Sequence, residues 1–345
     1  MEATPVNVST AFTVIITLIE PVCQMFEEYD FCDNALHILA PPFYHNFFYK
    51  EFNPRRNCGR IGLCPWNYKK DMDPINKILK EKPPTVHPQI NNSHSYMKFL
   101  VFNDIHADPL YMPNMEVTCV EPVCCRVGNQ HVSNGEGSWL WGTPGFCDLP
   151  YKTLDNFLDH ATDHMMVDSL LWLGDNPGHN VWEQHNENHL EIIEHITDIL
   201  SKKLPYLGQV YPVLGNHEGY PSDQFDLYSN QHKWIYEKCA KIWKIWLTNE
   251  SYESMRLYGR YHQLHPNTNL RMIAINPFTY DFLNSFIWNN STDPQGDLQW
   301  LEETLLYAES RNESVFILGH IAPSTIECER SIIITQIGIL DLMQQ

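Results

Sequence analysis

Four short apolar runs, each followed at once by a small polar cluster, most strongly limit what this chain can fold into. The runs are rich in Val, Leu, Ile and Phe and occupy residues 98–103, 169–173, 210–214 and 314–318. Their length and composition predict buried strands. Amphipathic stretches at 153–163, 185–203 and 298–309 predict helices that cover the sheet. We therefore expect an α/β (α+β) fold with one sizeable core.

The polar clusters contain the residue types that bind divalent metals. They are Asp104-Ile105-His106, Gly174-Asp175, Gly215-Asn216-His217-Glu218 and Gly319-His320. Open α/β sheets tend to place their sites just beyond the C-terminal ends of strands, so four such ends can share one pocket. Taken singly, each cluster is more often a turn or a cap than a set of ligands. The ordered set of four favours a metal centre.

The same residue types indicate the chemistry of such a centre. Carboxylate, imidazole and amide oxygen suit zinc, manganese or iron(II). One Asp can bridge two ions about 3.5–4 Å apart, and Asp175 is the candidate for this role. Two ions activate water near neutral pH and neutralise charge on phosphoryl oxygens. The pattern predicts hydrolysis of a phosphoester without a covalent enzyme intermediate.

Longer motifs resemble those of the acid sphingomyelinases, a family within the calcineurin-like metallophosphoesterases. The matching segments lie between about Met97 and Pro323, and they include residues 104–108, Cys-Asp-Leu-Pro at 147–150, residues 174–179, 211–218, 290–294, 298–301 and 319–323. The resemblance implies a metallophosphoesterase β-sandwich flanked by helices. It also implies a centre of two zinc ions.

The resemblance further implies a role for each site residue. The implied zinc ligands are Asp104 and His106 for the first ion, Asn216 and His320 for the second, and Asp175 for both. His179 and His217 match two histidines near the leaving-group oxygen, where an imidazolium can donate a proton. A loop histidine that faces solvent is the alternative interpretation of His179.

One departure from the family pattern lies at the C-terminal end. Family members continue to a Gly-His-Thr-His segment whose two histidines each bind a metal, whereas no histidine follows His320 in this chain. A catalytic zinc usually has three protein ligands. The chain is then a fragment, an inactive relative, or a protein in which another residue substitutes. We favour a fragment, truncated at both ends, because the N-terminus is also atypical.

The 10 cysteines favour an oxidising compartment, since disulfides are rare in reducing ones. The resemblance pairs Cys119 with Cys124 and Cys125 with Cys147; a zinc ribbon is the alternative for these four. We expect Cys239 and Cys328 to be unpaired. Sequons that permit glycosylation begin at Asn7, Asn91, Asn249, Asn289, Asn290 and Asn312. Together these features predict a secreted or lysosomal glycoprotein.

The N-terminal region divides into three predicted parts. Residues 1–22 form an atypical N-terminus, because the apolar run at 11–19 lacks a preceding basic residue and is a poor secretory signal. Residues 23–70 resemble part of a saposin-type helical domain; a short helical extension packed on the main domain is the alternative. Residues 71–96 contain several prolines and predict a linker. The phosphoesterase domain is expected at 97–345.

Charge limits the partners. A formal charge of −19 argues against nucleic acid, which needs a basic surface. The sequence contains no run of eighteen uncharged apolar residues, so we expect no transmembrane helix. His185 and His189 lie four residues apart on a predicted helix, which is the spacing of a helical metal pair. We favour the alternative that both face solvent on the polar side of the helix.

The combined expectation is a zinc phosphodiesterase that hydrolyses sphingomyelin to ceramide and phosphocholine. The partial saposin-like segment is expected to allow peripheral contact with a lipid surface. Two alternatives stay open: a hydrolase of nucleotides or other phosphodiesters, and a catalytically inactive lipid-binding protein.

Overall fold

The computed structural model describes residues 20–46, except 22, 26–28 and 45, and residues 96–322, except 134, 166, 204–208, 231–232, 282 and 289–292. Several sequence predictions lie outside these residues. They concern the apolar run at 11–19, residues 47–70 of the saposin-like segment, most of the linker at 71–96, the segment 323–345, Cys328, Asn7, Asn91, Asn289 and Asn290.

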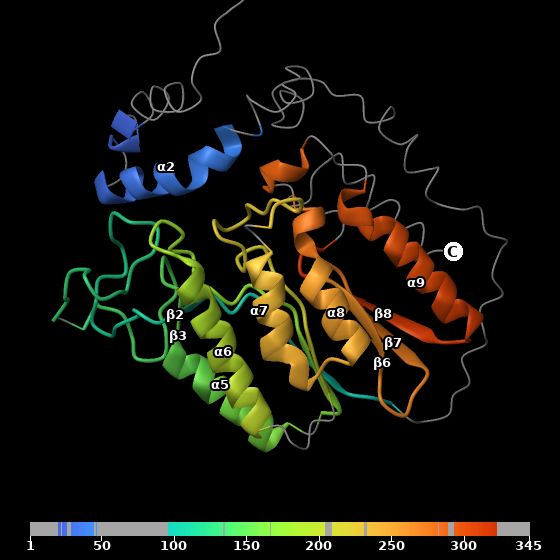
Figure 1. The fold of residues 1–345 in the computed structure, drawn as a ribbon. Coiled ribbons are helices and arrows are strands. Elements are labelled where there is room, and N and C mark those ends of the chain that lie inside the picture. Colours follow the sequence, from blue (N-terminus) through green and yellow to red (C-terminus); the bar gives the residue numbers. More distant parts are fainter. Residues whose placement is uncertain are drawn as a thin grey trace, which may run out of the picture.

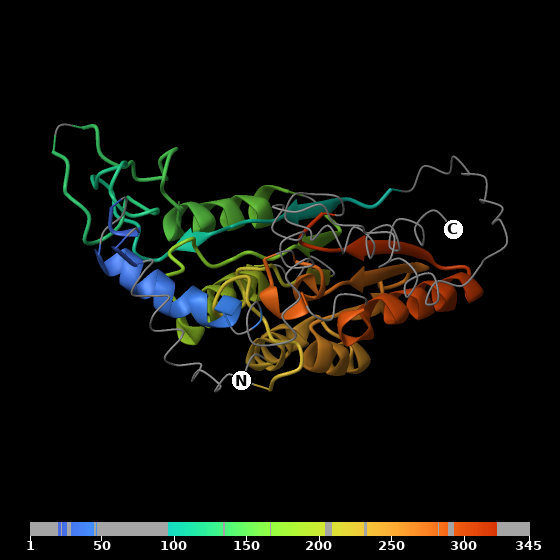
Figure 2. The same cartoon turned by 90° about the horizontal axis from the view of Figure 1, so that it is seen from above.

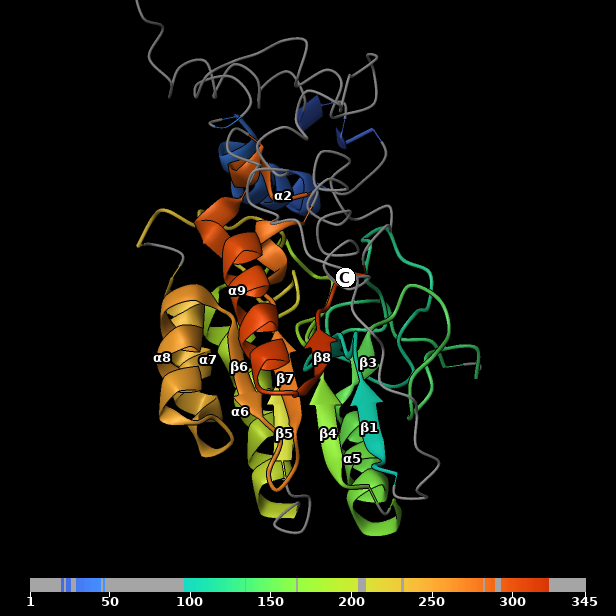
Figure 3. The ribbon, with the colours of Figure 1, turned by 90° about the vertical axis from the view of Figure 1, so that its right-hand side faces the viewer.

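Two three-stranded sheets form the centre of the fold, and all four predicted strands are confirmed (Figure 3). In the first sheet β1 (Phe99–Phe102), β4 (Ser169–Trp172) and β5 (Gln209–Pro212) are parallel. In the second sheet β7 (Leu270–Ala274) pairs antiparallel with β6 (Tyr261–Leu264) and parallel with β8 (Ser314–Leu318). The C-terminal ends of β1, β4, β5 and β8 therefore lie at the same end of the molecule (Figure 3).

The two sheets pack against each other as a sandwich. The Tyr261 hydroxyl donates a hydrogen bond to the carbonyl oxygen of Pro212 at 3.0 Å, which joins β6 to β5. The rings of Phe99 and Phe316 join β1 to β8, with centroids 5.5 Å apart. The α/β sandwich implied by the resemblance is thus confirmed.

Helices cover both outer faces of the sandwich (Figures 1 and 2). The three predicted helices are present as α5 (Tyr151–His164), α6 (Asn186–Lys203) and α9 (Asp297–Ser310). Two further helices, α7 (Trp234–Ile242) and α8 (Asn249–Tyr258), were not predicted. The signals of α8 are local: Thr248 accepts a hydrogen bond from the Ser251 amide at its start, and Gly259 ends it at φ 68°.

The main core lies between the first sheet and helices α5, α6 and α7. Trp172 of β4 and Trp243 of η3 (Trp243–Ile245) are fully buried, with ring centroids 5.5 Å apart. All four residues of β4 are buried, as expected for a central parallel strand covered on both faces. The short helices η4 (Pro277–Thr279), η5 (Ser285–Ile287) and η6 (Pro294–Gly296) lead from β7 to α9.

The N-terminal helix α2 (Tyr29–Tyr44) packs on the main domain (Figure 1). The ring centroids of Phe31 and Trp182 are 5.0 Å apart, and those of Phe43 and Trp288 are 5.5 Å apart. Cys23 and Cys32 form a disulfide beside the helix. The described part of this region is therefore a helix packed on the domain, and the wider saposin-like arrangement stays a prediction. Among the described helices, none is long and apolar enough to span a membrane.

Two small residues allow the strand ends of the first sheet to approach closely. These are Gly174, which follows β4 and has a φ of 89°, and Gly215, which follows β5. A Cβ atom at Gly174 would overlap the backbone nitrogen of Gly215, and one at Gly215 would overlap the carboxylate of Asp175. Both positions therefore require glycine, one of them for its backbone angle as well.

We predict that Gly174→Ala destabilises the fold far more than Gly128→Ala. Gly128 also has a positive φ, 107°, but a Cβ atom there would meet nothing within 4 Å. Gly128→Ala should cost about 1 kcal/mol for the backbone angle alone, whereas the collision at Gly174 should bring the loss to about 3 kcal/mol or more. Urea unfolding of the two variants measures the difference, and equal losses would contradict the close approach.

Candidate metal centre

Backbone hydrogen bonds continue the first sheet beyond its strand ends and place the metal-binding clusters side by side. The amide of Asp104 donates to Gly174 O at 3.2 Å, and the amide of His106 donates to Asp175 O at 3.0 Å. β2 (Ala107–Asp108) then pairs with β3 (Leu149–Pro150). Asp104, His106 and Asp175 have positive φ values of 54°, 41° and 56°. Such backbone strain is concentrated at functional sites.

Asp175 lies at the middle of the centre and is 3% exposed. Its Oδ2 atom is 3.1 Å from Nε2 of His320 and 3.6 Å from Nε2 of His106, while Oδ1 accepts from the His217 amide at 2.8 Å. Burial raises the pKa of Asp175, but the hydrogen bond from His320 and the charges of the neighbouring histidines outweigh it and lower the pKa to about 2. The carboxylate is therefore ionised in the absence of metal.

Two neighbouring groups of side chains have the spacing of metal ligands. The ligand atoms of Asp104, Asp175 and His320 all lie within 4.8 Å of one another. Those of His106, His179 and His217 do as well. The structure thus brings together the predicted carboxylates and all four predicted histidines. Which ligand belongs to which ion stays a prediction.

Second hydrogen bonds orient three of the predicted ligands. Nδ1 of His106 donates to Pro177 O at 2.9 Å, and Nδ1 of His320 donates to Leu173 O at 2.9 Å. Both Nε2 atoms therefore face Asp175, where a bound ion would replace the hydrogen bond between His320 and Asp175. The Asn216 side-chain nitrogen donates to Asp223 Oδ1 at 2.7 Å, which leaves its oxygen. Metal-binding histidines usually have their other ring nitrogen bonded in this way. The donor set therefore fits divalent cations.

Glu218 is a functional residue to which the sequence argument gave no role. Its fully buried carboxylate accepts from the Asp175 amide at 3.0 Å, from the Asn176 amide at 2.8 Å, and from the Gly215 amide. Burial, and secondarily the charge of Asp175, raises the pKa of Glu218. Glu218 joins the turns that carry Asp175 and Asn216. Its place at the end of the Gly-Asn-His-Glu motif was the available signal.

Asp148 is a second residue without a predicted role. Its Oδ2 atom accepts from the His179 amide at 2.6 Å, and its Oδ1 lies 2.7 Å from Nδ1 of His179. The His179 side chain is 51% exposed, so it does face solvent in part. Asp148 nevertheless holds its ring next to that of His106, and the two ring centroids are 3.9 Å apart. The position of Asp148 in the Cys-Asp-Leu-Pro segment was the signal.

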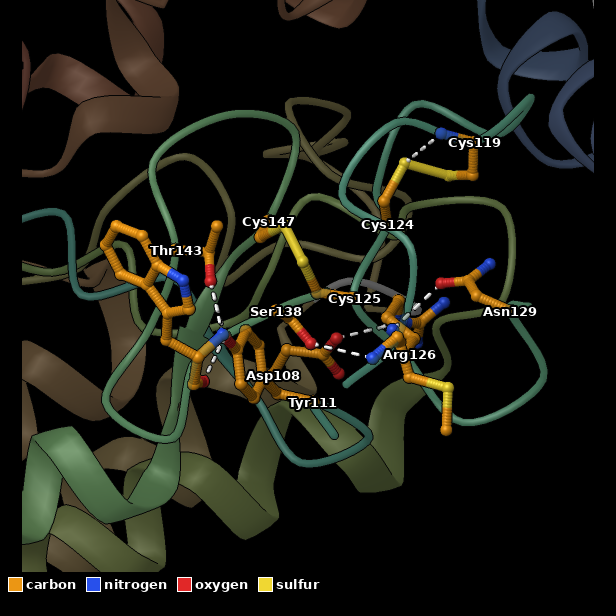
Figure 4. Close-up of a disulfide and its surroundings, with 12 residues drawn as sticks. Asp108, Tyr111, Cys119, Cys124, Cys125, Arg126, Asn129, Ser138, Thr143 and Cys147 are labelled. Carbon is orange, nitrogen blue, oxygen red and sulfur yellow. Dashed lines mark hydrogen bonds and ion pairs between the residues drawn. A yellow bond between two sulfur atoms is a disulfide. The ribbon is translucent and has the colours of Figure 1, made fainter. Parts of the chain in front are cut away.

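Disulfides anchor the loop that carries Asp148. The structure confirms Cys119–Cys124 and Cys125–Cys147 (Figure 4). Beside them Nε of the buried Arg126 is 2.7 Å from Oδ2 of Asp108 on β2. Cys239 is unpaired and buried, as expected. A disulfide and an ion pair thus fix the loop to the strand that follows His106.

The expectation for the two helical histidines is correct for His185 and wrong for His189. His185 is exposed, but His189 is fully buried, and its Nε2 donates to Gln184 Oε1 at 2.9 Å. Gln184 in turn donates to Gly178 O, next to His179. His189 can therefore be buried on α6, because a hydrogen bond to a buried partner satisfies its ring nitrogen.

This chain belongs to the calcineurin-like phosphoesterases, because the family model matches residues 97–336. Members of such a family bind divalent metals, in agreement with the donor set. Among curated proteins it is similar to sphingomyelin phosphodiesterase B of Dictyostelium discoideum, 30% identical over 88% of this chain and 47% of the relative. It is 36% identical to the human sphingomyelin phosphodiesterase over 66% of this chain and 36% of the relative.

A third relative differs in its named substrate. The human cyclic GMP-AMP phosphodiesterase SMPDL3A is 31% identical over 65% of this chain and 48% of the relative. The chain thus spans about half or less of the length of these relatives. These relatives confirm the predicted resemblance to the acid sphingomyelinase family.

We predict that His189 makes the fold less stable in acid. Burial lowers the pKa of His189 from 6.5 to about 4. The unfolded chain takes up a proton below about pH 6.5 and the folded chain does not, so stability is lost as the pH falls from 6.5 towards 4, by about 3 kcal/mol at pH 4. Urea unfolding at pH 7 and pH 4 should show a smaller acid loss for His189→Gln than for the parent.

The matched control for this measurement is His185→Gln, at an exposed position directly before α6. It should keep the acid loss of the parent protein. An unchanged acid loss in His189→Gln would show that His189 titrates alike in the folded and unfolded chains.

Proposed function

We propose that this protein hydrolyses sphingomyelin to ceramide and phosphocholine at a centre of two zinc ions. The observation that carries the proposal is the convergence of Asp104, Asp175 and His320 beside a group of three histidines. Its support from relatives is that several curated ones are named sphingomyelin phosphodiesterases. Membership of the family establishes only that the chain has the domain of a phosphoesterase. The substrate, the products and the two zinc ions are our proposal.

The residues present fit zinc, since carboxylate, imidazole and amide ligands are the ones it accepts. Bound zinc would lower the pKa of a water molecule and neutralise charge on the phosphoryl oxygens. Asp104 and His106 would hold one ion, Asn216 and His320 the other, and Asp175 both. Asp175 is already ionised, so it needs no proton loss to bind them.

His179 and His217 act on the leaving group in this proposal. Their rings lie 5.0 Å apart, and both are beside His106. His179 is half exposed, and its Nδ1 lies 2.7 Å from Oδ1 of Asp148, which holds the ring in place. Burial lowers the pKa of His217 to about 4. We assign proton donation to the ceramide oxygen to His179, because its ring is accessible and held by Asp148, and we place the buried His217 beside it as a positioning residue.

A second candidate function is hydrolysis of a nucleotide or another phosphodiester. It is favoured by the similarity to a protein named as a cyclic GMP-AMP phosphodiesterase. The third candidate is an inactive lipid-binding protein. For location we propose secretion or the lysosome, supported by three disulfides among the described residues.

We predict that elemental analysis of the dialysed protein finds close to two zinc ions per chain, and that a chelator abolishes phosphodiester hydrolysis. Asp175→Asn should lower both, because it removes the central carboxylate charge. Sphingomyelin in mixed micelles should be cleaved faster than cyclic GMP-AMP. The reverse preference would support the second candidate, and neither metal nor hydrolysis would support the inactive lipid-binding protein.

We predict that Asp148→Asn lowers kcat about 10- to 100-fold with little change in KM, because His179 loses the carboxylate that orients it. Steady-state kinetics on the cleaved substrate measures this. Asp155→Asn is the matched control, since Asp155 also pairs with a histidine, His195, at 2.8 Å. That variant should keep the parent kcat. Equal losses in both variants would mean that the effect is not specific to the site.

A further inference from the structure

Four large apolar side chains are exposed together in the disulfide-closed loop beside the metal centre. Trp139, Leu140, Trp141 and Phe146 are 61%, 47%, 51% and 62% exposed. They lie between Cys125 and Cys147, which are joined by a disulfide. We call these four residues the apolar tip. Exposed clusters of this kind mark interaction surfaces more often than isolated exposed residues do.

The loop is built to hold the apolar tip in this exposed position. The Tyr111 hydroxyl donates to Trp139 O at 2.7 Å, and the Trp139 amide donates to Thr143 Oγ1 at 2.7 Å (Figure 4). The Thr153 hydroxyl donates to Trp141 O at 2.7 Å. The amide and carbonyl of Trp139 and the carbonyl of Trp141 are thus bonded within the protein, although both side chains remain exposed. This exposure is a fixed feature of the loop.

Charge indicates what the apolar tip fits. Residues 138–147 contain no Asp, Glu, Lys or Arg, in a chain whose formal charge is −19. The nearby cation Lys152 lies with its Nζ 4.8 Å from the ring centre of Trp141. An acidic protein is repelled by an anionic membrane, whereas an uncharged aromatic surface with a single cation is compatible with zwitterionic head groups. Tryptophan favours such interfaces because its ring is apolar and its N–H is polar.

The apolar tip is continuous with the candidate site. Asp148 follows Cys147 directly and holds His179, and the amide of Leu149 donates to His106 O at 3.0 Å. The loop that carries the apolar tip is therefore joined to the edge of the centre where His179 is exposed. That edge is where the leaving group of a lipid phosphodiester would lie under the proposed function.

We propose that the apolar tip inserts into the interface of a zwitterionic phosphocholine lipid surface and so presents head-group phosphodiesters to the metal centre. The insertion of the apolar tip is independent of the proposed function, whereas the presentation of phosphodiesters to the metal centre rests on it. It assigns lipid contact to the phosphoesterase domain itself, in addition to the contact expected of the N-terminal segment. A second copy of this chain is the other occupant that the experiment distinguishes.

The test compares Leu140→Glu with Ile245→Glu. Ile245 is 60% exposed and lies in η3, whose neighbour Trp246 bonds Gln209 at the N-terminal end of β5, away from the site. Co-sedimentation with phosphatidylcholine vesicles should show binding of the parent and of Ile245→Glu, and at least about tenfold weaker binding of Leu140→Glu. Vesicles enriched in phosphatidylserine should bind the parent less well. Urea unfolding checks that both variants are folded.

Hydrolysis of bis(p-nitrophenyl) phosphate in free solution separates the two proposals. If the parent cleaves this diester but binds no vesicles, or if Leu140→Glu binds them as the parent does, the docking proposal is overturned and the proposed function stands. If the vesicle pattern is as expected and no diester is cleaved, docking stands and the proposed function fails. A parent dimer that sedimentation velocity shows to be lost in Leu140→Glu, with vesicle binding unchanged, would identify the tip as a contact between copies.

Discussion

The positions of the candidate metal ligands depend on the hydrogen bonds that the buried carboxylate of Glu218 accepts. This carboxylate accepts hydrogen bonds from the amides of Asp175 and Gly215, which lie in two turns forty residues apart in the sequence. Charge-assisted bonds of this kind are about twice as strong as neutral ones, and an amide left without its acceptor costs about 1–3 kcal/mol. Two buried carboxylates, Glu218 and Asp175, are thereby held next to each other. Their repulsion is relieved by His320 and would be relieved further by cations, so metal binding and stability are coupled here.

The disulfide-closed loop connects catalysis and surface in one short segment. Towards the inside, Asp148 fixes His179, and Arg126 pairs with Asp108 behind β2. Towards the outside, the same loop exposes the apolar tip. A loop held only by a few apolar contacts would not keep Asp148 and two exposed tryptophans in fixed positions, because exposed loops gain little from burial. Covalent closure by Cys125 and Cys147 supplies that rigidity, and this explains why the cysteines lie so close to the site residues in the sequence.

The sequence predicted the parts of the fold whose signal is local and missed those that depend on tertiary contacts. The four strands that carry ligands are short continuous apolar runs, and this signal survives without neighbours. β6 was missed because His262 and Gln263 interrupt it; Gln263 is buried and bonds Trp246 O at 3.0 Å, a partner that only the fold provides. His189 was misplaced for the same reason. The predicted ligands came together because parallel strand ends meet at one edge, whereas the roles of Glu218 and Asp148 required coordinates.

The N-terminal helix α2 packs against two segments near the candidate metal centre. Phe31 contacts Trp182, three residues after His179, and Phe43 contacts Trp288, whose neighbour Ser285 accepts a hydrogen bond from Asn46 at 3.1 Å. Aromatic pairs of this geometry contribute about 0.5–1.5 kcal/mol beyond their buried area. α2 therefore connects the loop of His179 to the turn of η5, two segments that are far apart in sequence. A shift of α2 would therefore act on Trp288 and on Trp182 together, and Trp182 lies in the loop that begins at His179.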